Sequence, residues 1–186
     1  CRPVRCPLQT GRLKNMQLPR PISIDMVDFL RDGRFDCIES GQTKEWILNN
    51  FPDPDGKCRI ADDIWLYGNI EFHFGDGELV NIYSDHFPHE KLHGGRHIAL
   101  KRRLLSRVKK LSLPRVIRWL NRRGIDFVKQ SDKLGIRLYL QSGVELYFEN
   151  DSGRPDRPRR FKMTAFCRTN GGANRYPVIR RLTGGE

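Results

Sequence analysis

The sequence predicts an α+β protein made of two tandem helix-helix-antiparallel-sheet units. Helix-start signals followed by short alternating strands and Gly-containing turns occur twice, in the same order along the chain. A shift of 74 residues places segment 70–74 on segment 144–148, and both segments alternate apolar and polar positions in the same way. With 186 residues, the chain can form one ordinary core or two small fused cores. The alternative is a single α+β domain whose halves resemble each other by coincidence.

The first unit is expected to begin with two short helices. Ser23 is a candidate N-cap for a helix over 24–31, which Gly33 would end, and Thr43 is a candidate N-cap for a helix over 44–50. An antiparallel meander is expected next, because alternating segments flank turns that contain glycine. Its strands are expected at 63–67, 70–74 and 78–83.

The second unit is expected to repeat this series. Residues 98–111 place apolar side chains on one arc at about 100° per residue and basic side chains opposite, as in an amphipathic helix. Ser112 would then cap a helix with Pro114 in its first turn and Gly124 just beyond its end. Strands are expected at 126–129, 136–140, 144–148 and 161–166.

These elements divide the chain into four segments. Residues 1–21 are expected to be a disordered or non-native N-terminal extension: either Cys1 is the lipid-bearing residue of a mature lipoprotein, or the true start is Met16 or Met26. Residues 22–96 form the acidic first unit with a linker, and 97–167 form the basic second unit. Residues 168–186 are expected to be a flexible tail, since they offer few apolar anchors.

Composition indicates a cytoplasmic protein without a cofactor. The five cysteines are odd in number, scattered and never arranged as C-x-x-C, which argues against both a disulfide framework and a thiolate zinc site. No stretch approaches the length of uninterrupted apolar sequence that spans a membrane, and no signal-peptide pattern is present.

Charge is distributed unevenly along the chain, whose formal net charge is +12. Residues 26–85 carry thirteen acidic and five basic side chains, whereas residues 86–123 carry one acidic and twelve basic side chains. The two units therefore present different surfaces to a charged partner.

Residues 41–53, Gly-Gln-Thr-Lys-Glu-Trp-Ile-Leu-Asn-Asn-Phe-Pro-Asp, resemble the L-G-M-T-K-E-E-V-x-x-L-L-G-x-P-D helix of the SmpA/OmlA-like lipoproteins and of bacterial proteins of unknown role. The resemblance implies a fold in which two helices pack on a small antiparallel sheet. The β-lactamase inhibitor protein resembles two such units in tandem, so the resemblance also implies binding to other proteins rather than catalysis. It assigns no functional residue, because the matching motif begins a helix.

Residues that could carry chemistry do not form a known catalytic or metal-binding pattern. His86, His89, His93 and His97 have helix-like spacings, but Pro88 and the glycines at 94 and 95 interrupt a helix, so a solvated linker is expected in place of a metal site. The acidic residues of the first unit lie among Pro, Gly and Lys in a predicted loop. Neither a nucleophile motif nor a phosphate-binding loop occurs, so we expect no enzyme.

The leading hypothesis is a non-enzymatic protein-binding module, of the bacterial immunity or inhibitor type. Exposed aromatic side chains of the sheet are the expected contacts with the partner, and ordinary cross-strand packing is their alternative role. These candidates are Trp65, Tyr67, His73, Tyr139 and Tyr147.

The runner-up is a basic nucleic-acid-binding protein that uses the helical region 98–123. Its positive charge would give strongly salt-dependent binding, although only one aromatic residue is interleaved with that charge. The candidate residues are Arg102, Arg103, Arg107, Lys109, Lys110 and Arg118.

Overall fold

The computed structural model of the chain describes residues 21–58, 61–86, 90–101, 105, 111–133, 135–150 and 161–169. Over these residues the fold is α+β, as predicted, with three helices and a large antiparallel sheet. The elements in chain order are β1 (Ile22–Asp25), α1 (Met26–Asp32), α2 (Lys44–Asn50), β2 (Gly56–Lys57), β3 (Ile64–Tyr67), β4 (Ile70–Gly75), β5 (Glu78–Ser84), β6 (Ile98–Lys101), α3 (Leu113–Arg122), β7 (Phe127–Asp132), β8 (Gly135–Leu140), β9 (Val144–Asn150) and β10 (Phe161–Thr169). None of the helices described is long and apolar enough to cross a bilayer.

Eight strands form one sheet in the order β2-β3-β4-β5-β10-β9-β8-β7. The two halves of the chain meet at its centre, where β5 and β10 pair antiparallel with Tyr83 opposite Cys167 and Asn81 opposite Thr169. The strands β1 and β6 form a separate parallel pair. The main sheet is therefore shared by the first and second halves of the chain.

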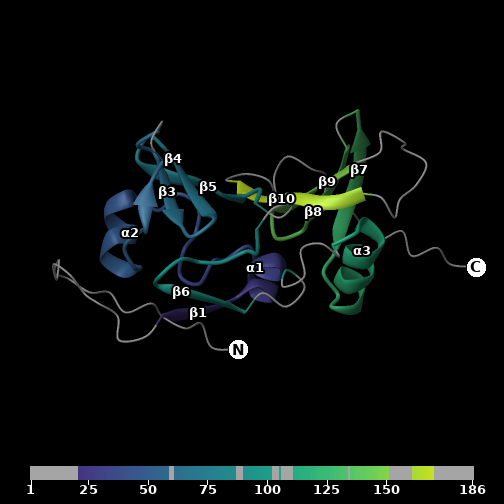
Figure 1. Ribbon diagram of the computed structural model, residues 1–186, viewed down its shortest axis with the longest axis horizontal. Coiled ribbons are helices and arrows are strands. Elements are labelled where there is room, and N and C mark those ends of the chain that lie inside the picture. Colours follow the sequence, from purple (N-terminus) through teal and green to yellow (C-terminus); the bar gives the residue numbers. More distant parts are fainter. Residues whose placement is uncertain are drawn as a thin grey trace, which may run out of the picture.

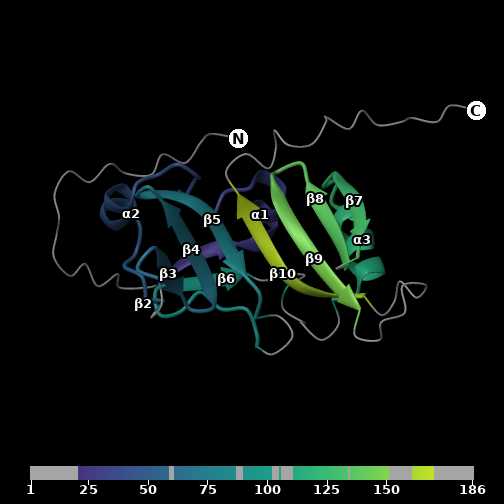
Figure 2. The same ribbon diagram turned by 90° about the horizontal axis from the view of Figure 1, so that it is seen from above.

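The helices and the β1–β6 pair lie together on one side of the eight-stranded sheet (Figure 1). The core forms there, because Phe29 of α1 packs edge-on against Phe166 of β10 at 5.4 Å between ring centroids. Phe51, directly after α2, stacks on Phe72 of β4 at 6.1 Å. Seen from above, no described helix crosses the opposite side of the sheet (Figure 2). We call that side the open face.

The first half confirms most of the predicted elements. Thr43 caps α2, and its Oγ1 accepts a hydrogen bond from the backbone N–H of Trp46 at 3.1 Å. The first helix begins later than expected, because Asp25 in place of Ser23 is its cap and accepts a bond from the Val27 N–H at 2.9 Å. Ser23 lies in β1 instead. The three predicted strands correspond to β3, β4 and β5.

Gly33 ends α1 as predicted and brings the helix against the second half of the chain. Its φ of 73° is in the left-handed region that glycine favours, and a Cβ atom there would lie 2.4 Å from the Ser142 carbonyl oxygen. Ser142 Oγ donates a hydrogen bond to the Leu30 carbonyl oxygen at 2.8 Å. The end of α1 thus contacts the turn between β8 and β9.

The predicted helix over 98–111 is wrong at its start, because residues 98–101 form β6. Ile98 pairs with Ile22 and Leu100 with Ile24, and the exposed Ala99 alternates with these core-facing side chains. Side chains two positions apart share a face in a strand but not in a helix, so the alternation over 98–101 and the presence of a partner strand both favour β6 over the helical arc of the longer segment. Of the remaining positions, 102–104 and 106–110 lie outside the described residues.

The rest of the second half follows the prediction closely. Ser112 occupies the N-cap of α3 without a side-chain capping bond, Pro114 lies in the first turn, and Gly124 follows the end with a φ of 62°. The strand expected at 126–129 is longer, since β7 extends to Asp132. Residues 168 and 169 belong to β10 and not to a flexible tail, and the remainder of the tail lies outside the described residues.

The segment expected to be a solvated linker is anchored where the structure describes it. The His93 backbone N–H donates to Asn69 Oδ1 at 2.9 Å, and Leu92 is buried. Gly95 packs so closely on the first half that a Cβ atom there would overlap the Asp55 carboxylate and lie 2.7 Å from the Gly68 nitrogen in the β3–β4 turn. His93 is therefore held beside the first half by its backbone. His89 lies outside the described residues.

Candidate protein-binding surface

Strand alternation places polar and aromatic side chains on the open face. In β4 the apolar side chains at 70, 72 and 74 are buried, whereas Glu71 and His73 point to the other side of the sheet. In β9 the buried positions are 144, 146 and 148, and Glu145 and Tyr147 point outward. The same pattern that builds the core thus builds the open face.

Register aligns these outward positions across the junction of the two halves. Tyr83 of β5 lies opposite Glu71 of β4 on one side and Cys167 of β10 on the other. Cys167 in turn lies opposite Glu145 of β9, which lies opposite Tyr139 of β8. Neighbours directly opposite on one face are close enough to contact. A continuous row of side chains therefore crosses five strands on the open face.

Short hydrogen bonds hold this row and its neighbours in place. Tyr147 donates from its hydroxyl to Glu145 Oε2 at 2.8 Å, and His73 Nε2 lies 2.7 Å from Glu71 Oε2. Cys167 donates from Sγ to Asn81 Oδ1 at 3.1 Å. These bonds restrict the rotamers of the side chains that a partner would meet, which lowers the entropy lost on binding.

A hollow of about 290 Å³ opens in this face at the junction between the halves. Its walls include two phenol rings and two carboxylates, from Tyr83, Asp85, Tyr147, Glu149, Thr164 and Ala165. Arg137 approaches the Tyr147 ring at 5.2 Å from its centroid, so a cation already stacks on one of these rings. The chemistry of the hollow suits the end of a lysine or arginine side chain.

Burial raises the pKa of three titratable groups in and beside this row, the side chains of Tyr83, Tyr147 and Cys167. Burial, together with the nearby Asp85 carboxylate, raises the pKa of Tyr83 to about 12. Burial and the hydrogen bond to Glu145 also raise the pKa of Tyr147. Burial and the charge of Glu145 raise the pKa of the Cys167 thiol to about 12, so this sulfur is a poor nucleophile at neutral pH.

The structure separates the five predicted contact residues into two groups. Trp65 and Tyr67 are 4% and 1% exposed and face the core, where they pack against Phe74 and Phe72, so their predicted exposure is wrong. Tyr139 is on the open face but only 8% exposed. His73 and Tyr147 are on the open face but are half-buried, whereas exposed side chains were expected.

Several residues of this surface were missed by the prediction, among them two carboxylates and a tyrosine near the predicted contacts. Tyr83, Glu71 and Asp85 lie on the open face beside the predicted His73 and Tyr147. The alternation of side chains along β5 was the only sequence signal that Tyr83 faces outward. The register shift in the β4–β5 pair after His73, however, changes which positions of β5 face outward. Nothing in the sequence of either half alone predicts that β5 pairs with β10.

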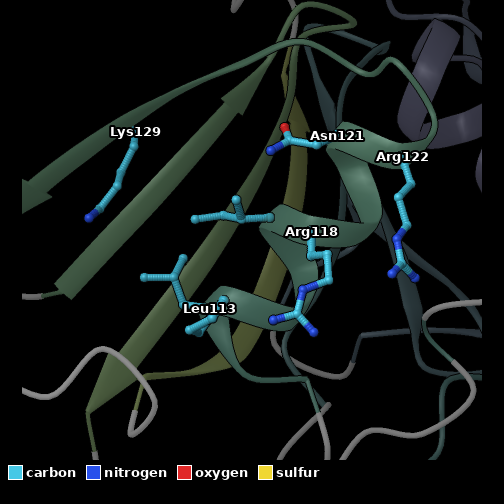
Figure 3. Close-up of a pocket in the computed structure, with 7 residues that line it drawn as sticks. Leu113, Arg118, Asn121, Arg122 and Lys129 are labelled. Carbon is cyan, nitrogen blue, oxygen red and sulfur yellow. The ribbon is translucent and has the colours of Figure 1, made fainter.

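A second hollow lies on the helix side of the sheet, between α3 and β7 (Figure 3). Arg118, one of the predicted nucleic-acid-binding residues, is exposed at this groove. The other predicted members, Arg102, Arg103, Arg107, Lys109 and Lys110, lie outside the described residues.

Neither a search for metal-binding side chains nor comparison with known proteins assigns a further functional site. In the part of the chain that the structure describes, no three His, Cys, Asp or Glu side chains are grouped so that they could hold a metal ion. Comparisons with protein-family models, curated proteins and solved structures gave no match to this chain.

Proposed function

We propose that the chain is a non-enzymatic protein-binding module of the immunity or inhibitor type, which binds a basic partner protein through the open face. The observation that carries the proposal is the row of tyrosines and carboxylates across the junction of β5 and β10, with the hollow between Tyr83 and Tyr147. No described helix covers it.

The chemistry of this surface matches what protein interfaces use. Tyrosine is enriched among residues that dominate binding energy, because it buries a large ring while its hydroxyl keeps a hydrogen-bond partner. Among the described residues of this face, the carboxylates of Glu71, Asp85, Glu145 and Glu149 outnumber the cations of Arg137 and Lys162. This imbalance favours a positively charged partner and would accelerate its association.

Two tandem helix-helix-sheet units are part of the same proposal. The strand order supports them, because β2 to β5 and β7 to β10 occur in mirrored order from the two ends of the sheet. Ile22 of β1 pairs with Ile98 of β6, 76 positions later, which is close to the shift of 74 that aligns β4 with β9. The resemblance of residues 41–53 to the SmpA/OmlA-like proteins points to the same kind of unit.

A cytoplasmic location also belongs to this proposal. Among the described cysteines, Cys58 and Cys167 are free thiols, which is usual in a reducing compartment. Nucleic-acid binding is the weaker proposal. Of its candidate residues only Arg118 is described, and the residues that line the groove beside it include no aromatic ring on which a base could stack.

Quantitative capture of partners from a lysate of the bacterial host tests the proposal. The immobilised wild-type chain is compared with Tyr147→Ala and Glu145→Gln, and the recovered partner is then purified for binding measurements. Loss of a central tyrosine contact costs about 2 kcal/mol or more, so we expect Tyr147→Ala to raise the Kd about 30-fold.

Leu48→Ala is the matched control, because Leu48 is 40% exposed on α2, away from the open face. It should leave capture and Kd unchanged. A partner that the open-face variants retain in full, or repeated capture that yields no partner, would refute the proposal. A toxin gene directly upstream of this gene would support the immunity type.

A further inference from the structure

The strand β7 is an edge of the eight-stranded sheet, and no other described strand pairs with its outer side. It pairs only with β8 among the described strands. Edge strands expose a row of backbone N–H and C=O groups, and proteins usually shorten or cover such edges. The opposite edge, β2, has two residues, whereas β7 has six. A long edge of this kind can accept an added strand.

The register of the β7–β8 hairpin identifies the backbone groups that point outward. The Gln141 N–H donates to the Asp126 carbonyl oxygen at 3.1 Å, which makes these two residues a hydrogen-bonded pair. Such pairs alternate along an antiparallel ladder, so the next ones are Val128 with Tyr139 and Gln130 with Arg137. The N–H and C=O groups of Phe127, Lys129 and Ser131 therefore point away from β8.

The same alternate residues direct their side chains to the helix side. Lys129 lies opposite Leu138, which is fully buried in the core, so both side chains leave the sheet on the face that α3 covers. Lys129 accordingly lines the groove between β7 and α3 (Figure 3). A strand added to β7 would thus direct every second side chain into this groove.

The groove has a volume of about 630 Å³, an apolar floor and a basic rim. Its floor comes from α3 and includes Leu113, Pro114 and Ile117. Arg118 and Arg122, one helical turn apart, and Lys129 across the groove supply three positive charges, and Asn121 completes the lining. No acidic residue occurs within α3. Charge complementarity therefore selects an anionic occupant, and the floor requires that it also carry apolar side chains.

We propose that this groove binds an extended segment of a partner protein that carries both acidic and apolar side chains and adds to β7 as a ninth strand. Backbone hydrogen bonds to Phe127, Lys129 and Ser131 would supply sequence-independent affinity, and the alternate side chains would supply specificity. An apolar side chain would meet Ile117, and a carboxylate would meet Arg118 or Arg122. The charge of Lys129 also disfavours the addition of a purely apolar strand to β7, and so favours an acidic segment.

Selection from a phage-displayed library of random peptides on the full chain tests this proposal. We expect enrichment of peptides in which Asp or Glu alternates with Val, Ile or Leu. The double variant Arg118→Glu with Arg122→Glu should weaken a selected peptide at least about tenfold, since like charges then face each other across the contact. Arg115→Glu is the matched control, because Arg115 is exposed on α3 but does not line the groove, and it should have little effect.

Two further measurements identify the binding mode and the class of ligand. Hydrogen exchange by NMR should show that the amides of Phe127, Lys129 and Ser131 become protected when the peptide binds. Tyr147→Ala should leave peptide binding intact, which separates this site from the open face. The proposal is overturned if no peptide is selected, if charge reversal has no effect, or if those amides stay unprotected. It is equally overturned if random-sequence single-stranded or duplex DNA binds the groove and no acidic peptide does.

Discussion

At the scale of single residues, Asp55 links three segments of the first half. Its Oδ2 accepts a hydrogen bond from the Gly68 N–H at 2.8 Å, and its Oδ1 accepts bonds from the backbone N–H and Nε of Arg96, both at 3.1 Å. Burial alone would raise the pKa of Asp55, but the hydrogen bonds from Arg96 and Gly68 outweigh it and lower the pKa. One carboxylate thus fixes the segment that leads into β6.

We expect Asp55→Asn to lower the free energy of unfolding at pH 7 by about 1–3 kcal/mol, because an amide accepts these bonds less well and directs N–H groups at other donors. A lowered folded-state pKa gives stabilisation that is present above the unfolded-state pKa, about 3.8, and is lost as pH falls through the folded-state value. Urea denaturation at pH 7 and at pH 3 measures both effects. Asp62→Asn, at an exposed position, is the control. A difference that is absent at pH 7, or equally large at pH 3, would contradict this account.

At the scale of secondary-structure elements, the β1–β6 pair is the main departure from the predicted fold. It joins residues 22–25 to 98–101 in parallel, and Ile24 and Ile98 are nearly inaccessible to solvent. Parallel pairing requires a long connection, which here contains most of the first half. Local sequence patterns cannot reveal a partner that lies so far away along the chain.

Ala99→Val distinguishes a strand from a helix at this position. Ala99 is exposed in β6, where a β-branched residue is favoured, so we expect the free energy of unfolding to rise by about 0.5 kcal/mol. In a helix the same change would lower it by about as much. Urea midpoints and Cα chemical shifts of residues 98–101 measure the two alternatives. At Arg115 in α3, by contrast, the Arg115→Ala variant should be more stable to unfolding than the Arg115→Val variant, because the position is helical. Loss of stability in Ala99→Val together with helical shifts would refute the strand.

The elements of the main sheet were largely predictable, and the reasons are local. Alternation and glycine turns located β3, β4, β8 and β9, and Thr43 marked the start of α2. The candidate surface was predictable only in part. Alternation along a strand divides its side chains between the two faces of the sheet, but it does not say which face is buried. Trp65 and Tyr67 are buried because they lie on the face that the helices cover. That choice, like the pairing of β5 with β10, is a tertiary property.

At the scale of the whole molecule, the two halves are joined by more than a linker. The pairing of β5 with β10 makes one sheet of both halves, and Phe166 of β10 packs against Phe29 of α1 beneath it. The turn at Ser142 bonds to the end of α1 as well. Opening this junction would expose Phe166, which is fully buried, and would leave strand edges of both halves unpaired.

We therefore expect the halves to unfold together as one cooperative unit. The chain has three tryptophans, of which Trp46 and Trp65 lie in the first half and Trp119 in the second, so 5-fluorotryptophan labelling gives each half its own ¹⁹F NMR signal. In a urea titration the three native signals should disappear at one midpoint.

Phe166→Leu, which removes part of the packing at the junction, should lower that common midpoint and reduce the free energy of unfolding by about 1–3 kcal/mol. Leu48→Ala, at an exposed site on α2, should leave it nearly unchanged. If Trp119 keeps its native signal at urea concentrations where Trp65 has lost its own, the halves are independent, and the surface across β5 and β10 is not a single rigid site.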